Sequence, residues 1–413
     1  MNIGLAGALF KTHRRKRQVP MQVIANQANI TNSSISDFEN GKKILSKERL
    51  TLLYQCLGMD YAAASDMNEF MNVLDQMIID ICCDSTVNVT YDDISKYENI
   101  VNFNECYFLY QLMQLLITIY RNDSFISEVK KNEIIKTLEA NVEFIPSKFK
   151  AIVYDTLGIC YDHVDYHKAI DYLKKGLHNV TRDELQALIF YHIGMNKNYH
   201  GELSEALELF TKAKIIFDEH LIYTRSLMCH IEIGIVYMQL GLSTKAEKNN
   251  LECIRYAKKK PELRPKLICA YNNLLWLYIR DKQYAKVLAY KDEVLALDPL
   301  NPNFLSYMGI AYYYLDDKEQ AKLYLERTKE ESVRATKNQM ALMDVYLTMI
   351  TRYRYREIEN KIKIAYEYSV KDYDHQLQIF LLNLQIENQL NFQHNEQLSE
   401  LQQLLNQKLM ERK

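Results

Sequence analysis

A polar stretch close to the N-terminus carries side chains that could recognise a polar partner. Residues 25–43 read "ANQANITNSSISDFENGKK", with only Ile30, Ile35 and Phe38 as large apolar side chains. The amides, hydroxyls and carboxylates between them donate and accept hydrogen bonds. Ile35 and Phe38 are three residues apart and would hold one face of a short helix against a core. The stretch therefore presents polar groups outward from a packed helix.

Four short helices are predicted around this stretch. They span residues 3–17, 21–28, 32–40 and 47–58. Pro20 suits the start of the second helix, Thr31 is a good N-cap for the third, and Gly41 ends it. Their expected core residues are Ile3, Leu5, Leu9, Phe10, Val23, Ile24, Ala28, Leu50, Leu53 and Leu57. This order is typical of a helix-turn-helix, whose second helix lies in the major groove of DNA.

Residues 19–42, "VPMQVIANQANITNSSISDFENGK", resemble the lambda-repressor-like, or XRE-type, helix-turn-helix family without a gap. The matching positions are Ile24, Ala25, Ile30, Ser33, Ile35, Ser36, Glu39, Gly41 and Lys42. The resemblance implies DNA contacts from Gln22, Thr31, Asn32, Ser33, Ser34, Asp37, Lys42, Lys43, Arg14 and Arg15. The family usually has Gln at the position of Met21 and Arg at the position of Asp37. Both departures would weaken binding to phosphate. Asp37 could accept from a cytosine amino group or pair within the head.

Charge is unevenly distributed along the chain. Residues 1–60 carry nine Lys and Arg against four acidic residues, a net charge of +5. Because the whole chain has a formal net charge of −2, the remainder carries −7. Only the N-terminal head would be attracted to phosphate, which supports the interpretation that it binds double-stranded DNA.

Five segments of the long C-terminal part align on the tetratricopeptide (TPR) pattern. They begin "YDTLGICY", "FYHIGMNKNY", "HIEIGIVY", "YNNLLWLY" and "LSYMGIAYYY". Their Gly or Gly-equivalent positions are 158, 194, 234, 275 and 309, spaced by 36, 40, 41 and 34 residues. The small residues would let the two helices of each repeat approach closely. Residues 101–146 and 330–413 are helical by pattern but match poorly, as end repeats of a solenoid often do.

A TPR superhelix has a concave groove lined by the first helix of each repeat. Projecting that geometry onto the chain places on the groove Asp155, Asp162, Tyr191, Asn198, Asn272, Trp276, Arg280 and Tyr313. Asn can form hydrogen bonds with both the N–H and the C=O of a peptide backbone. Aromatic rings offer flat apolar walls, and Arg280 could bind a terminal carboxylate. Each of these residues could equally be ordinary surface, and Trp276, the one tryptophan, could be structural.

Composition narrows the possible classes of protein. The 413 residues include only eleven Gly and six Pro, the residues that most often form turns in β-rich folds, so we expect an all-α chain. The eight cysteines are scattered and are expected to be free thiols, with no metal site. No catalytic or dinucleotide-binding motif is found, so we expect neither an enzyme nor a cofactor. Without a signal peptide or membrane span, the protein is expected in the cytoplasm.

An XRE-type head followed by a TPR body resembles the RNPP family of peptide-responsive regulators of Gram-positive bacteria. The resemblance implies a helix-turn-helix domain at residues 1–62, a connector at 63–100, and a right-handed TPR α-solenoid at 101–413 that senses peptides and oligomerises. It further implies that a short signalling peptide binds the groove and resets the geometry of a homodimer on a pseudo-palindromic operator. A second regulatory protein is a further possible partner.

Two alternatives remain open from the sequence. One is a phage or plasmid repressor controlled by a protein anti-repressor. The other is a TPR adaptor or phosphatase-like protein in which the helix-turn-helix is vestigial. In the second case the basic surplus of the head would have no purpose, which favours DNA binding.

Overall fold

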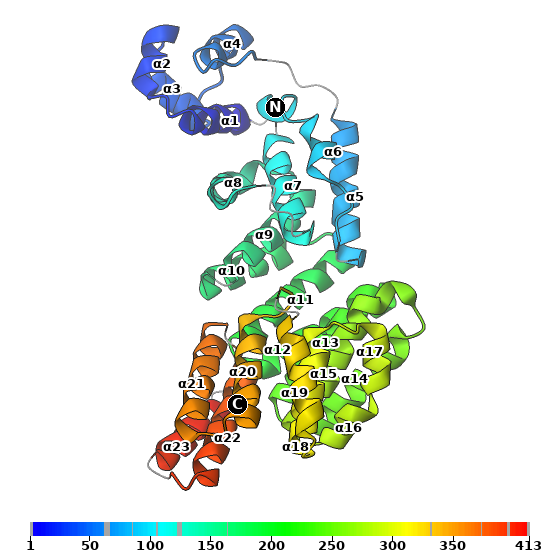
Figure 1. Ribbon diagram of the computed structural model, residues 1–413. Helices are drawn as coiled ribbons and strands as arrows, with labels where there is room; N and C mark the ends of the chain where they lie inside the picture. Colours follow the sequence, from blue (N-terminus) through cyan, green and yellow to red (C-terminus); the bar gives the residue numbers. More distant parts are fainter. Residues whose placement is uncertain are drawn as a thin grey trace. The chain divides into compact units, whose positions relative to one another are not determined.

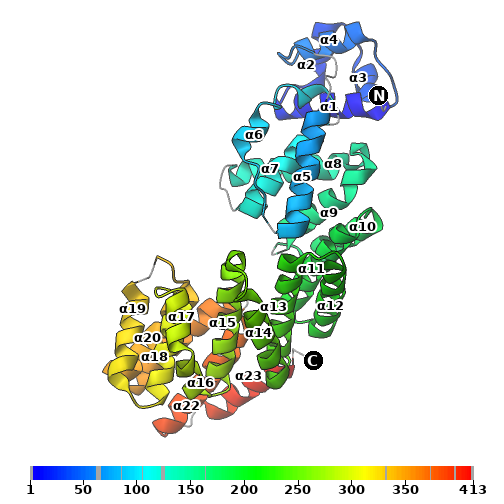
Figure 2. The same cartoon turned by 90° about the vertical axis from the view of Figure 1, so that its right-hand side faces the viewer.

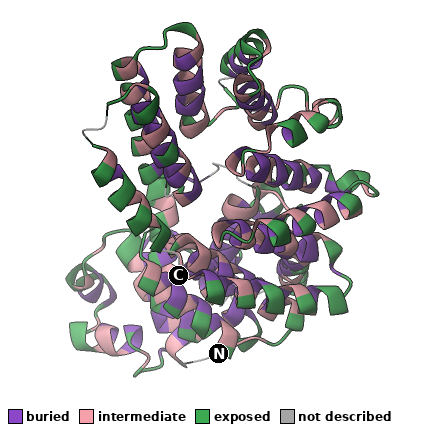
Figure 3. Ribbon diagram, turned by 90° about the horizontal axis from the view of Figure 1, so that it is seen from below, coloured by how far each residue is buried: buried purple, intermediate pink, exposed green. Residues whose placement is uncertain are grey.

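The computed structural model describes residues 3–61, 67–84, 86–104, 106–121, 126–162, 164–330, 333–372, 374–394 and 397–410. All regular structure within these ranges is helical (Figure 1). The predicted all-α TPR solenoid is therefore confirmed. Most helices have a buried side and an exposed side, as Figure 3 shows, so the fold is built from amphipathic helices.

Most of the helices follow one another through short connections. The first eleven α-helices are α1 (Ile3–Lys16), α2 (Met21–Ala28), α3 (Asn32–Glu39), α4 (Lys47–Gln55), α5 (Asn68–Asp84), α6 (Tyr91–Ser95), α7 (Cys106–Arg121), α8 (Glu128–Asn141), α9 (Ser147–Tyr161), α10 (Tyr166–His178) and α11 (Asp183–Tyr199). The others are α12 (Leu203–Glu219), α13 (Tyr223–Gln239), α14 (Ser243–Ala257), α15 (Arg264–Arg280), α16 (Tyr284–Ala289), α17 (Lys291–Leu297), α18 (Pro302–Tyr314), α19 (Lys318–Glu330), α20 (Lys337–Thr351), α21 (Tyr355–Lys371), α22 (His375–Asn391) and α23 (Leu398–Met410). Three short 3-10 helices are η1 (Val101–Phe103), η2 (Val142–Phe144) and η3 (Pro261–Leu263).

The chain divides into two compact units. The first contains Met1–Asn196 and Ile216–Arg225, and the second contains Lys197–Ile215 and Ser226–Lys413. The head, α1 to α4, belongs to the first unit together with α5 to α10. The domain limits 1–62, 63–100 and 101–413 stay a prediction.

The head has one apolar core. Ile35 and Phe38 of α3 are 0% and 2% exposed, and they pack with Phe10, Ile24 and Leu53. Ile35 and Phe38 are therefore confirmed as buried, whereas Ile30, the third large apolar residue of the polar stretch, is half-buried against the same core. Other predicted core residues that are buried here are Leu5, Leu9, Ala28, Leu50 and Leu57. Val23 is the exception, with 40% of its surface exposed, and the side chain of Ile3 lies outside the described residues.

The junction between α2 and α3 explains how the polar stretch is shaped. Asn29 has a left-handed φ of 51° and closes α2, and the Thr31 hydroxyl accepts a hydrogen bond from the Ser34 amide at 3.2 Å. After α3, Gly41 has a φ of 70°, which glycine adopts without strain. These local signals set both ends of α3.

Each of the five predicted repeats is a pair of helices. The pairs are α9/α10, α11/α12, α13/α14, α15/α16 and α18/α19. The second helix of the fourth repeat is broken at Tyr290, between α16 and α17. Beyond the fifth repeat, α20/α21 and α22/α23 continue the stack, and Figures 1 and 2 show α18, α19 and α20 side by side.

The predicted small residues bring paired helices into close contact. A Cβ on Gly158 would lie 2.5 Å from Cγ of Leu173, and one on Gly309 would lie 2.6 Å from Cγ of Leu325. In both pairs, the added carbon would also approach a backbone carbonyl of the second helix. The interpretation of these glycines as close-packing positions is confirmed.

Candidate nucleic-acid interface and peptide groove

Four of the predicted DNA-contacting side chains form one polar surface over α2 and α3. The Asn32 amide nitrogen donates to Oε1 of Gln22 at 2.5 Å. The Lys43 ammonium donates to the Ser34 hydroxyl at 2.7 Å. Gln22, Asn32 and Lys43 are exposed and Ser34 is half-buried, so these contacts pre-order groups that remain open to solvent.

The other predicted DNA-contacting residues have varied surroundings. Ser33, Thr31, Arg15 and Lys42 are exposed, and Asp37 is half-buried on α3. Ser33 follows Asn32 at the start of α3, the part of a recognition helix that meets base edges. The base-contacting role of these residues stays a prediction.

The prediction that Arg14 contacts DNA requires a correction, because its side chain is paired with Glu39 inside the head. Its guanidinium forms a two-pronged ion pair with Glu39, with Nε 2.6 Å from Oε1 and Nη2 2.8 Å from Oε2. It also donates to the carbonyl of Val19 at 3.1 Å. The Arg14 and Glu39 side chains are 12% and 2% exposed. Hydrogen bonding to Glu39 raises the pKa of Arg14, and this neutralised cation is removed from the proposed DNA contacts.

The head is seated on the rest of the first unit through aromatic and histidine contacts. Nε2 of His13 lies 2.8 Å from the carbonyl oxygen of Asn102, and its ring lies 4.7 Å from that of Tyr107. The Tyr54 ring meets Phe103 at 5.0 Å. His13 is 2% exposed, and burial lowers its pKa to about 4, with Arg17 and Lys16 adding to the shift and the Asn102 carbonyl opposing it.

Acidification is expected to destabilise the first unit through His13. The folded protein keeps this ring neutral, whereas in the unfolded chain it takes up a proton near its ordinary pKa of 6.5. The stabilisation is complete above about pH 6.5 and is lost as the pH falls towards about 4. We expect a loss of about 2 kcal/mol between pH 7 and pH 5 in urea unfolding. The His13→Phe variant should lose this component of the pH dependence; an unchanged slope would contradict the assignment.

The second unit contains a groove of about 530 Å³ on the inner helices of its repeats. Its lining comes mainly from α13, α15, α18, α20 and the start of α22. The lining includes Gln239, Asn273, Trp276, Asn303, Tyr307, Asn338, Gln339, Asp372, Asp374 and Gln376. Such a volume suits a short peptide segment or a small molecule.

Trp276 provides the apolar wall of the groove. Its ring centroid lies 5.9 Å from that of Tyr307 and 5.2 Å from that of Phe380. Burial raises the pKa of Tyr307, with Asp374 adding to the shift, so its hydroxyl stays a donor at ordinary pH. Trp276 is half-buried and lines the groove, and its role in peptide binding stays a prediction.

Unpaired amide groups are the main polar feature of the groove. Gln239 Oε1, Asn273 Nδ2, Asn338 Oδ1 and Gln376 Nε2 are buried and have no hydrogen-bond partner among the described residues. Two are donors and two are acceptors as assigned, and an amide can be turned to exchange them. A buried polar atom without a partner costs about 1–3 kcal/mol. A ligand that offers both N–H and C=O groups would remove this penalty.

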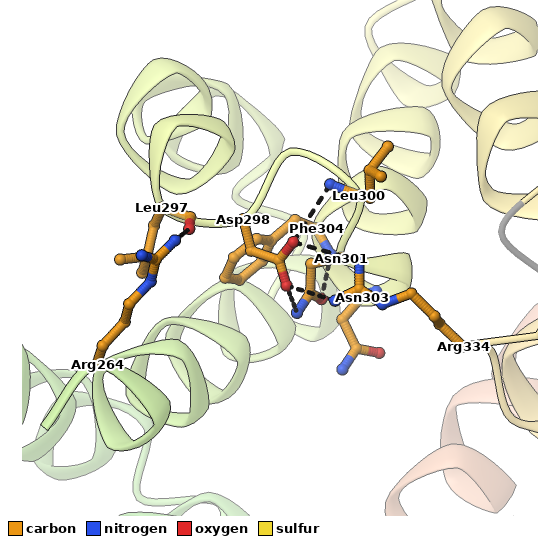
Figure 4. A network of polar contacts seen from close by, with 8 residues as sticks. All are labelled: Arg264, Leu297, Asp298, Leu300, Asn301, Asn303, Phe304 and Arg334. Carbon is orange, nitrogen blue, oxygen red and sulfur yellow. Dashed lines mark hydrogen bonds and ion pairs between the residues drawn. The ribbon is translucent and has the colours of Figure 1, made fainter. Parts of the chain in front are cut away.

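A polar network holds the entry to α18, from which Asn303 reaches the groove (Figure 4). Oδ1 of Asn301 accepts hydrogen bonds from the backbone amides of Asn303 and Phe304 at 3.1 and 3.3 Å. Asp298 accepts from the Asn301 side chain at 3.3 Å and from Arg334 at 2.8 Å. Asn303 in turn accepts from Gln339 of α20. The network therefore fixes one wall of the groove.

Three other predicted peptide contacts lie in the first unit. Asp155 is fully buried, and its carboxylate meets Nδ1 of His192 at 2.8 Å, so it is a core residue and cannot touch a groove ligand. Tyr191 is 7% exposed. Asp162 is half-buried at the C-terminal end of α9.

In the second unit, Arg280 also needs correction. Its guanidinium donates to Asp281, to the carbonyl of Met238 and to the Ser243 hydroxyl, so it ties α15 to the α13–α14 turn. We therefore remove it as an anchor for a terminal carboxylate. Asn198, Asn272 and Tyr313 are half-buried but lie outside the groove lining.

The prediction from sequence missed Gln239, Asn338 and Gln376, and it was wrong by one position at Asn273. It selected Asn272, whereas Asn273 lines the groove. Adjacent helical residues point about 100° apart, so an error of one position moves a side chain to another face. Asn and Gln recur on the first helices of the repeats, and this recurrence was the available signal for the groove amides. Only the packing of the helices decides which of these side chains face the groove.

No group of three or more His, Cys, Asp or Glu in the described ranges is placed to share a metal ion. Among the helices described, none is both long and apolar enough to cross a membrane.

Several solved structures share the fold of this chain. A Rap protein complexed with competence and sporulation factor matches with a TM-score of 0.66 at 12% identity, covering 84% of this chain and 99% of that one. The apo quorum sensor NprR from B. thuringiensis matches with 0.59 at 14% identity, over 83% and 99% of the two chains. Aspartyl phosphate phosphatase F from Bacillus subtilis matches with 0.58 at 12% identity, over 84% and 96%.

These likenesses are structural. No model of a protein family matches the sequence, and no curated protein is significantly similar to it. Rap and NprR belong to the RNPP family of TPR-repeat quorum-sensing regulators, and this chain shares their fold. The resemblance to that family is confirmed at the level of the fold.

Proposed function

We propose that this protein is a DNA-binding transcriptional regulator whose TPR groove binds a short signalling peptide. The observation that carries the proposal is the set of unpaired amides around Trp276, in a fold shared with a Rap protein that was solved with a signalling factor. We place its action in the cytoplasm, where the DNA is. We assign it no catalytic activity.

The groove chemistry suits an extended peptide. Four amide atoms would bond successive N–H and C=O groups, and Trp276 with Tyr307 would cover an apolar side chain. The described residues that line the groove include Asp372 and Asp374 but no Lys or Arg. A neutral or basic peptide is therefore favoured over an acidic one.

Coupling between peptide and DNA would run through the geometry of a homodimer. Two heads must reach half-sites about 34–36 Å apart, or a multiple of that distance, on a pseudo-palindromic operator. A peptide that binds one dimer geometry better shifts the population towards it. By linkage, DNA must change peptide affinity by the same factor as peptide changes DNA affinity.

Peptide binding can be followed with the single tryptophan. Titrating synthetic apolar heptapeptides with free, acetylated or basic N-termini should change Trp276 fluorescence, because this ring lines the groove. Asn273→Ala with Gln376→Ala should weaken binding at least tenfold, since each amide contributes about 1 kcal/mol. Asn272→Ala is the matched control, one residue away and outside the lining. Equal losses in control and test variants would contradict the groove assignment.

DNA binding can be tested separately with gel shifts on genomic fragments. We expect salt-sensitive binding, because head cations replace counterions on phosphate. Asn32→Ala with Ser33→Ala should abolish the specific component, whereas Gln27→Ala, on an exposed position of α2, should not. Complete absence of salt-sensitive binding would instead favour the TPR adaptor.

The adaptor alternative is supported by one comparison, the likeness to aspartyl phosphate phosphatase F. It predicts a second regulatory protein as the main partner and no response to DNA. A chain that binds a phosphorylated response regulator but shifts no DNA fragment would establish this alternative. A repressor controlled by a protein anti-repressor would bind DNA but no peptide.

A further inference from the structure

A second cavity lies within the first unit, where the head meets the helices that follow it. It encloses about 520 Å³ between α1, the end of α3, α7, α8 and η2. Its lining includes five cationic side chains on two elements: Lys11, Arg15 and Lys16 of α1, and Lys130 and Lys136 of α8. No role in DNA or peptide binding explains the two lysines of α8.

The cavity has more positive than negative charge. Three carboxylates line it, those of Glu39, Glu133 and Glu143. Glu39 is already neutralised by Arg14. In the described part of the chain, the remaining cations Arg15, Lys16, Lys130 and Lys136 form no ion pair within 4.0 Å.

Lys16 of α1 and Lys130 of α8 line the cavity from opposite elements, and among the described residues neither forms an ion pair. Burial lowers the pKa of Lys16, and Lys130 and Arg17 lower it further, with partial compensation from Glu133. Like charges that face each other across a partly buried space repel. An anion placed between α1 and α8 would attract both Lys16 and Lys130 and so offset the repulsion between them.

The rest of the lining suits a ligand with an organic part. Tyr107 and Phe144 provide ring surfaces, and Asn40 and Gln111 provide amides. The Lys11 ammonium donates to Asn40 at 3.0 Å, which orients that lysine at the rim. Lys and Arg groups bind phosphate through charge-assisted hydrogen bonds, and the volume is within the usual range for a small-molecule site.

We propose that this cavity binds a small phosphorylated anion of about nucleotide size, bridging α1 of the head to α8. The phosphate groups lie among Arg15, Lys16, Lys130 and Lys136. The bound anion ties the head to the rest of the unit and engages Arg15, a predicted phosphate contact for DNA. Ligand and DNA therefore compete for part of the same positive charge. The inference does not depend on peptide binding.

The proposal can be tested by calorimetric titration of the full chain with ATP, GTP and inorganic triphosphate. We expect saturable binding of at least one probe, weakened at least tenfold by Lys130→Ala with Lys136→Ala. Lys131→Ala is the matched control, because Lys131 pairs with Glu128 at 3.6 Å and is not part of the lining. Binding of a nucleotide but not of triphosphate would show that the organic part is required, and equal binding of both would show a phosphate site alone.

Two outcomes would overturn the proposal. One is the lack of saturable binding by all three probes at millimolar concentration. The other is binding that Lys130→Ala with Lys136→Ala leaves unchanged. If the same double variant weakens only the binding of DNA fragments, the two lysines extend the DNA interface and the small-anion site is rejected.

Discussion

Replacing Gly7 with alanine is expected to unfold the N-terminal head. A Cβ at this position of α1 would lie 1.9 Å from the carbonyl oxygen of Phe38 and 2.8 Å from its carbonyl carbon. The obstacle is backbone, so no side-chain rotation can relieve the contact, and α1 must separate from α3. We expect a loss of about 3 kcal/mol or more, at or above the upper end for overpacked cores. Hydrogen exchange of amides in α1 to α4 measures it directly.

The control for this variant is Gly58→Ala. Gly58 has a φ of 68°, but a Cβ there would meet nothing within 4 Å. The Gly58→Ala variant should therefore show only the backbone strain of alanine in the left-handed region, about 1 kcal/mol. If the two variants protect the head amides equally well, the close approach of α1 and α3 is not essential.

Breaking the ion pair between Arg14 and Glu39 is expected to have the second large effect. Glu39→Ala leaves a guanidinium with a 12% exposed side chain without its carboxylate, and Arg14→Ala leaves the more deeply buried Glu39 alone. Removing one partner of a buried pair typically costs about 3–5 kcal/mol. Because the Arg14 side chain keeps some access to water, we expect about 3 kcal/mol for either variant in urea unfolding.

The double variant Arg14→Met with Glu39→Leu separates charge burial from packing. It removes both charges and keeps apolar volume, so much of the lost stability should return. Arg15→Ala, on the next and exposed residue, should leave stability nearly unchanged while reducing the salt dependence of DNA binding. Additive losses in the double variant would show that Arg14 and Glu39 do not act as a pair.

Local sequence signals were sufficient to predict the helices that build the candidate sites. Thr31 and Gly41 marked the ends of α3, and Ile35 and Phe38 marked its buried side, because capping and helical periodicity depend on nearby residues. The spacing of Gly158 and Gly309 likewise predicted close helix pairs. Each of these features is encoded within a few turns of chain.

Contacts between distant residues decided which side chains remain available for binding. The pairing of Arg14 with Glu39 spans 25 residues, and that of His13 with Asn102 spans 89, so no local pattern identified either. The sequence determined that the chain is a basic head joined to TPR repeats. Only the tertiary structure decided that Asn273 rather than Asn272 lines the groove, that Arg14 is paired with Glu39, and that lysines of α1 and α8 share one cavity. The reason is physical: helical periodicity identifies a buried face, but the neighbour that covers it depends on how the helices pack.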